Sequence, residues 1–119
     1  MRGTWDADII DDIKPSYEDH IIIKRRDSAF QDTELRVWLR SARINILIFC
    51  GVDTSICIET SLRDGFNQGY DVILVADTTA TGKNRHYETT LERVRDYYGI
   101  VTHLHESRRT ICLLIELDR

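Results

Sequence analysis

Cys57 lies where a nucleophilic cysteine could be built. An apolar run at 46–50 ends at Gly51, and the helical pattern that follows can be capped by Thr54 or Ser55. Cys57 then falls in the first helical turn, where unpaired backbone N–H groups and the helix dipole favour the thiolate. A thiolate can attack a carbonyl carbon and form a covalent acyl-enzyme. The alternative is a small buried hydrophobe, which free cysteine often is.

Strand and helix patterns alternate around this turn. Strands are expected at 20–24, 45–50, 71–76 and 100–105, and helices at 33–42, 56–68 and 84–98. This alternation predicts βαβ units around a parallel sheet, and therefore an α/β fold. Open parallel sheets bind ligands outside the carboxyl ends of their strands. We therefore expect three residues at those ends to meet at one rim of the sheet: Lys24, Cys57 and Asp77.

Two sequence blocks resemble the isochorismatase-like cysteine hydrolases. The segment 51–66, GVDTSICIETSLRDGF, is similar to the family's nucleophile turn, with matches at Gly51, Val52, Thr54, Cys57, Arg63 and Asp64. The segment 20–40 resembles the strand that ends in the family's catalytic lysine and the loop and helix after it, with matches at Lys24, Ser28, Phe30, Thr33 and Leu35. The opening GTWDADIID, from Gly3, is most similar to the ureidoacrylate and carbamoyl-amide hydrolases.

The resemblance implies a Rossmann-like fold and a reaction. Cys57 is expected to cleave an amide or ureido C–N bond of a small molecule through an acyl-enzyme, while Lys24 stabilises its thiolate. The family's cis peptide bond maps to Val52–Asp53, and the backbone N–H groups of Asp53 and Cys57 are expected to form the oxyanion hole. Substrate contacts are expected from Trp5 and Phe30, and no cofactor is implied.

The sequence also departs from the family pattern. The family's catalytic Asp lies in a D-x-Q-x-x-F segment on the first strand, and this sequence enters the pattern only at Gly3. We therefore expect the sheet to lack its first strands and catalysis to be impaired. The metal-binding cluster of nicotinamidases belongs to the same unmatched region, so no metal site is implied. The alternative function is that of a catalytically inactive relative, acting as an interaction or regulatory domain.

Composition favours a single domain over residues 1–119, with 42% hydrophobic residues and a net charge of −4. Apolar runs are far shorter than the ~20 residues of a membrane helix. Basic residues occur in short runs flanked by acids, which argues against nucleic acid as a partner. Cysteines at 50, 57 and 112 lack zinc-type spacing and suggest reduced thiols in a cytoplasmic protein.

The C-terminal segment 108–119 predicts an additional strand, because apolar residues continue on both faces. Only a few residues separate it from the expected strand at 100–105, whereas a parallel return needs a dozen or so. We therefore expect an antiparallel hairpin, whose apolar edge a second protomer covers. The protein is accordingly predicted to be a homo-oligomer, a dimer or larger. The gap beside 45–50 could alternatively be closed by the strand at 20–24 or by another chain.

Overall fold

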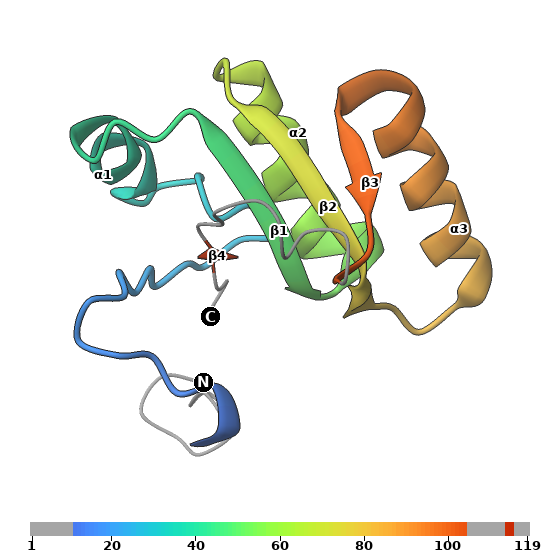
Figure 1. Ribbon diagram of the computed structural model, residues 1–119, viewed down its shortest axis with the longest axis horizontal. Helices are drawn as coiled ribbons and strands as arrows, with labels where there is room; N and C mark the ends of the chain where they lie inside the picture. The colour runs from blue at the N-terminus through green and yellow to red at the C-terminus, as the bar shows by residue number, and fades with distance from the viewer. Residues whose placement is uncertain (1–10, 105–113, 116–119) are drawn as a thin grey trace.

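A parallel sheet forms the centre of the protein. The structure is a computed structural model, and it describes residues 11–104 and 114–115. The sheet has four strands in the order β3-β2-β1-β4 (Figure 1), and each neighbouring pair is parallel. The strands are β1 (Ile46–Val52), β2 (Asp71–Ala80), β3 (Ile100–Thr102) and β4 (Leu114–Ile115). The predicted α/β fold with a parallel sheet is therefore confirmed.

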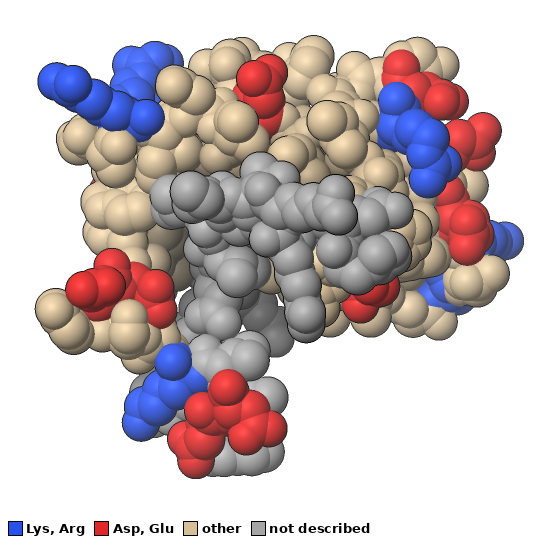
Figure 2. Space-filling view, in the orientation of Figure 1, with Lys and Arg blue, Asp and Glu red and all other residues tan. Residues whose placement is uncertain are grey.

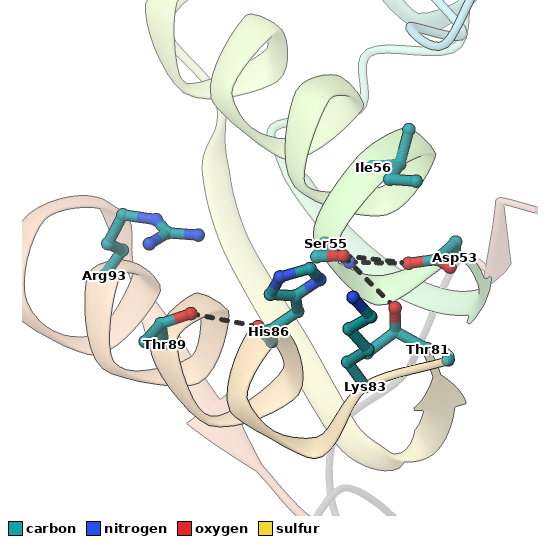
Figure 3. A pocket seen from close by; sticks show the side chains of 9 residues that line it. Asp53, Ser55, Ile56, Thr81, Lys83, His86, Thr89 and Arg93 are labelled. Atoms are coloured by element: carbon teal, nitrogen blue, oxygen red, sulfur yellow. Dashed lines mark hydrogen bonds between the residues drawn. The ribbon is translucent and has the colours of Figure 1, made fainter.

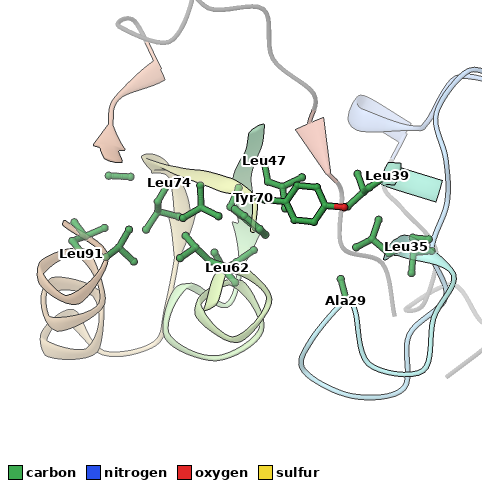
Figure 4. Packing of buried hydrophobic residues seen from close by; sticks show 14 residues of the cluster. Ala29, Leu35, Leu39, Leu47, Leu62, Tyr70, Leu74 and Leu91 are labelled. Carbon is green, nitrogen blue, oxygen red and sulfur yellow. The ribbon is translucent and has the colours of Figure 1, made fainter. Parts of the chain in front are cut away.

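The helices form two continuous segments and two shorter pieces. The segments are η3 (Thr54–Ile58) with α2 (Glu59–Asn67), and α3 (Asn84–Arg93) with η4 (Val94–Tyr98); the pieces are η2 (Asp11–Ile13) and α1 (Leu35–Ser41). In Figures 1 and 4, α2 and α3 lie side by side on one face of the sheet, and α1 lies beyond the β1 side. No helix in the described ranges is long and apolar enough to cross a membrane.

The hydrophobic core lies between the sheet and these helices (Figure 4). Alternate residues of β1 and β2 point to the helices, as the two-residue period of a strand requires. Residues three or four apart on the helical segments pack against these strand residues. Each such buried aliphatic or aromatic side chain stabilises the fold by about 1.5–3 kcal/mol. The cluster includes Leu47, Phe49, Val72, Leu74, Ile58, Leu62, Leu91 and Val94.

The expected strand at 20–24 does not form. Only Ile23 takes part in a bridge, and the flanking residues are irregular. Burial nevertheless alternates as in a strand, since Ile22 and Lys24 are buried while Ile21 and Ile23 are exposed. The alternation expected of a strand is therefore present in the burial, but within the described part of the chain the segment forms a single bridge and no ladder.

The antiparallel hairpin expected at the C-terminus is also wrong. β4 pairs in parallel with β1, with Leu114 opposite Ile48 and Ile115 opposite Phe49, on the opposite edge of the sheet from β3. β3 ends at Thr102 and β4 begins at Leu114, so the two strands are separated in sequence by about the dozen residues that a parallel return needs. The homo-oligomer was predicted because a second protomer would cover the exposed edge of that hairpin. Without the hairpin this reason no longer applies, and the homo-oligomer stays a prediction.

A buried carboxylate joins α2 to α3. Glu59 accepts hydrogen bonds from the Thr90 hydroxyl (2.7 Å) and from Nε and Nη2 of Arg93 (2.8 and 2.7 Å), and it pairs with Arg63 at 2.6 Å. Burial acts to raise the pKa of Glu59, but the hydrogen bonds from Arg93 and Thr90 and the charges of both arginines outweigh it, so the pKa lies below its ordinary value. The ionised form therefore stabilises the contact between the helices.

We expect Glu59→Gln to lower the free energy of unfolding at pH 7 by about 1–3 kcal/mol, since the arginines lose their charge partner but are themselves partly exposed. The native pKa lies below the unfolded value of about 4.3, so this contribution is complete above that pH and is lost as the pH falls towards the native pKa. Urea unfolding between pH 7 and pH 3 measures both effects. Glu88→Gln, at an exposed site on α3, is the control, and equal losses in the two variants would contradict the assignment.

Gly99 allows the end of η4 to pass close to β2. A Cβ at this position would overlap the carbonyl oxygen and side chain of Val72, and the backbone of a central strand cannot easily move. The Gly99 N–H also bonds to the Val94 carbonyl oxygen (2.9 Å), which ends the helical segment. The absence of a side chain here therefore sets the distance between the α3–η4 segment and the sheet.

We expect Gly99→Ala to destabilise the protein by about 1–3 kcal/mol through this overlap. Gly82→Ala is the matched control, because a Cβ at Gly82 meets nothing within 4 Å. Thermal and urea unfolding followed by circular dichroism distinguish the two variants. Equal stabilities of the two variants would show that β2 can move away from a Cβ at position 99 without loss of stability. The explanation from the close approach of Gly99 to Val72 would then be wrong.

Candidate functional site

The turn between β1 and η3 presents Cys57. Gly51 has φ +113°, the peptide bond Val52–Asp53 is cis, and η3 then begins at Thr54. The cis bond lies where the family resemblance implied one. The expected cap was Thr54 or Ser55, but Asp53 is the capping residue, because its carboxylate accepts the N–H of Ser55 at 3.0 Å. Cys57 follows within the first turn and is half-buried.

Cys57 lines a cavity with a buried lysine. The cavity has a volume of about 390 Å³ and is lined by Lys24, Arg25, Arg26, Asp27 and Cys57. Lys24 is only 5% exposed, and its ammonium donates to the Arg26 carbonyl oxygen at 3.0 Å. The structure thus brings Lys24 and Cys57 together at one site. Their chemical roles stay predictions.

A buried hydrogen bond holds the lysine-bearing loop on α2. The N–H of Ala29 donates to the hydroxyl oxygen of Ser61 at 2.9 Å, and both residues are buried. Within the loop, the N–H of Phe30 donates to the Ser28 hydroxyl oxygen at 3.1 Å. Ser61 lies on the same helical segment as Cys57, so this contact carries the loop to the edge of the nucleophile turn.

The same loop brings a carboxylate to the thiol, which the sequence analysis missed. The Cys57 thiol donates to Oδ1 of Asp27, with a sulfur–oxygen distance of 3.7 Å. A signal for it was present in the sequence. Asp27 lies between the matched residues Lys24 and Ser28, so any loop that carries Lys24 to the cysteine also carries this acid.

Other expected residues lie elsewhere or outside the described residues. Asp77 accepts the Leu104 N–H at 2.9 Å and does not line the cavity. The Phe30 ring packs against the core beside Tyr70, with ring centroids 6.4 Å apart, so its predicted contact with substrate stays a prediction. Trp5 lies outside the described residues.

A second cavity of about 510 Å³ is lined in part by Asp53, Ser55 and Ile56 of the same turn (Figure 3). Burial acts to raise the pKa of Asp53, but hydrogen bonds from Thr81 and Ser55 outweigh it, so the pKa lies below its ordinary value. The Ser55 hydroxyl connects these groups, at 3.1 Å from Asp53 and 3.2 Å from Thr81. The Asp53 side chain therefore lines this cavity, whose described lining residues include no cysteine. Its lining comprises Asp53, Ser55, Ile56, Thr81, Gly82, Lys83, His86, Thr89 and Arg93.

Charge on the visible face of the molecule is mixed. In Figure 2, basic and acidic side chains lie around the edge of the view and form no continuous basic surface there. Within residues 11–104 and 114–115, no three His, Cys, Asp or Glu side chains come together as metal ligands.

The thiol cavity is the candidate active site, because it combines a nucleophile, a buried cation and a carboxylate.

Known proteins share both the sequence and the fold. The chain is 37% identical over 102 residues to the ureidoacrylate amidohydrolase RutB of Serratia proteamaculans, covering 85% of this chain and 41% of that relative. An isochorismatase-like hydrolase from Alkaliphilus metalliredigens superposes with a TM-score of 0.84 at 28% identity, covering 90% of this chain and 60% of that one. N-carbamoylsarcosine amidase from Thermoplasma acidophilum gives a TM-score of 0.78 at 28% identity, with 87% and 58% covered.

The chain spans less than half the length of this curated relative, so these comparisons concern the shared part. In this chain, β1 to β3, the cis turn and the lining of the thiol cavity all lie within residues 1–106. The family model described as the isochorismatase domain matches residues 1–106. By this match, this chain belongs to the isochorismatase family.

Proposed function

We propose that this chain is a hydrolase of small molecules that cleaves a C–N amide or ureido bond with Cys57 as its nucleophile. The observation that carries the proposal is the shared cavity of the half-buried Cys57 thiol and the buried Lys24 ammonium. A buried ammonium stabilises an anion that forms beside it, so Lys24 is proposed to stabilise the sulfur of Cys57 when its proton leaves. Relatives named as ureidoacrylate amidohydrolase and N-carbamoylsarcosine amidase support this bond type.

The reaction begins with attack of the Cys57 sulfur on the carbonyl carbon, and the C–N bond then breaks to leave an acyl-enzyme. Water hydrolyses the acyl-enzyme and restores the thiol. The N–H groups of Asp53 and Cys57 are proposed to stabilise the oxyanion, as the family resemblance implies. Lys24 is proposed to stabilise the negative charge that develops on sulfur as its proton leaves.

The lining of the cavity favours an acidic substrate. Arg25 and Arg26 line it beside Lys24, and Asp27 is its one carboxylate among the described lining residues. Excess positive charge in a small cavity attracts and orients a carboxylate on the substrate. A ureido acid such as ureidoacrylate satisfies both requirements, because it carries the scissile C–N bond and the negative charge.

We expect iodoacetamide to alkylate Cys57 several-fold faster than Cys50 at neutral pH. Cys57 faces a cavity with a cation, whereas Cys50 lies within β1. Quenched time courses analysed by peptide mass spectrometry give the rate at each cysteine. Cys50→Ser should leave the labelling of Cys57 unchanged. Equal rates at the two cysteines, or faster labelling of Cys50, would remove the basis for a nucleophilic Cys57.

We expect Cys57→Ala to abolish the hydrolysis of ureidoacrylate, because it removes the attacking sulfur. Lys24→Met should reduce the rate by about 10²-fold by destabilising the thiolate, whereas Lys83→Met, in the second cavity, should not. Substrate loss followed by chromatography, with mass spectrometry of a quenched acyl-enzyme, provides the measurement. Turnover that survives Cys57→Ala, or no turnover and no acyl-enzyme in the parent chain, would refute the proposed function.

A further inference from the structure

We propose that Asp27 is a catalytic residue that exchanges the proton of the Cys57 thiol during the reaction. The inference rests on the proposed function, since it assigns the group that moves protons for that nucleophile. Its basis is the hydrogen bond from the Cys57 thiol to Asp27 Oδ1, at 3.7 Å, within the cavity that both residues line. A proton acceptor must lie within hydrogen-bond reach of the proton it takes, and Asp27 meets this condition.

Three other carboxylates near the turn are engaged elsewhere. Asp53 accepts from the N–H and hydroxyl of Ser55 at the second cavity. Glu59 is held by Thr90 and two arginines. Asp77 accepts the N–H of Leu104. Among the described residues that line the thiol cavity, Asp27 is therefore the carboxylate able to serve Cys57.

The loop holds Asp27 between two fixed points. On one side, the buried Lys24 ammonium bonds to the carbonyl oxygen of Arg26, directly before Asp27. On the other, the buried Ala29 N–H bonds to the Ser61 hydroxyl oxygen. These anchors lie within two residues of Asp27 and limit how far its backbone can move. An exposed carboxylate on such a segment is positioned for proton transfer and still reaches water.

The proton balance closes with this one carboxylate. Asp27 takes the thiol proton as sulfur bonds to the carbonyl carbon, and gives it to the leaving nitrogen as the C–N bond breaks. In the second half, Asp27 takes a proton from water as the water oxygen bonds to the acyl carbon. That proton returns to sulfur as the C–S bond breaks. One water is consumed, and the enzyme regains its starting form.

The charges facing Cys57 in this cavity are Lys24, Arg25, Arg26 and Asp27, and they act on the thiol in opposite directions. The three cations favour the thiolate, and the carboxylate disfavours it. Removing the charge of Asp27 should therefore make the thiolate easier to form while it removes the proton carrier. A proton-transfer role predicts opposite changes in alkylation and in hydrolysis, which a merely structural role does not.

The test compares Asp27→Asn, Asp27→Glu and the control Asp96→Asn in the full chain. Asp96 is an exposed acid on η4 outside the cavity. Asp27→Asn should raise the rate of Cys57 alkylation by iodoacetamide about fivefold at neutral pH, the effect of one unit charge near 4 Å in water. The same variant should lower ureidoacrylate hydrolysis by about 10²-fold. Asp27→Glu should retain much of the hydrolysis, and Asp96→Asn should match the parent chain in both assays.

The outcomes separate this inference from the proposed function. Cys57-dependent hydrolysis that is unchanged in Asp27→Asn would overturn the role of Asp27 and leave the proposed function standing. Unchanged alkylation of Cys57 in Asp27→Asn would overturn the contact itself, and it requires no turnover. Absence of Cys57-dependent hydrolysis in the parent chain would overturn the proposed function, and with it the catalytic role of Asp27. Circular dichroism of each variant establishes that the fold is retained.

Discussion

The candidate site depends on one buried hydrogen bond, from the Ala29 N–H to the Ser61 hydroxyl oxygen. It joins a loop without regular structure to α2, and neither partner could be left unpaired in the core without a cost of about 1–3 kcal/mol. The loop carries Lys24 and Asp27, whereas the helical segment carries Cys57. The contact therefore brings residues about thirty positions apart in the sequence to one site, where Lys24 and Asp27 lie beside Cys57.

Helix geometry explains how one short segment serves three neighbours. Cys57 and Ser61 are four residues apart and so share a face, which is turned to the loop. Ile58 and Leu62, also four apart, share the face that packs on the sheet. Glu59, two residues from Cys57, points to α3 and is held there by Arg93. The positions of the thiol, the core and the ion pair are thus set by the same helical period.

Residues of the nucleophile turn line two cavities, and the chemistry of these cavities differs. The thiol cavity offers a buried ammonium, two guanidinium groups and a carboxylate. The second offers hydroxyl groups and basic side chains around the Asp53 carboxylate, whose hydrogen bonds are made within the turn. Asp53 caps the helix and supports the geometry of the turn. The division leaves Asp27 facing sulfur and gives the loop a chemical role besides carrying Lys24.

The sequence by itself determined those features that depend on residues close together in the chain. The apolar run before Gly51 and the helical periods predicted a parallel α/β sheet, with Lys24 and Cys57 at one rim of it. The cis peptide bond was implied by the resemblance of the residues around Cys57 to a known family. Tertiary structure decided the rest, because it depends on partners distant in the chain. Long-range contacts decide three features: whether the segment 20–24 pairs along its length, which edge of the sheet β4 joins, and which carboxylate meets the thiol. A residue's neighbours in space leave no periodic pattern in the sequence. The position of Asp27 between Lys24 and Ser28 placed it on the right loop, but only the fold shows that its carboxylate meets the thiol.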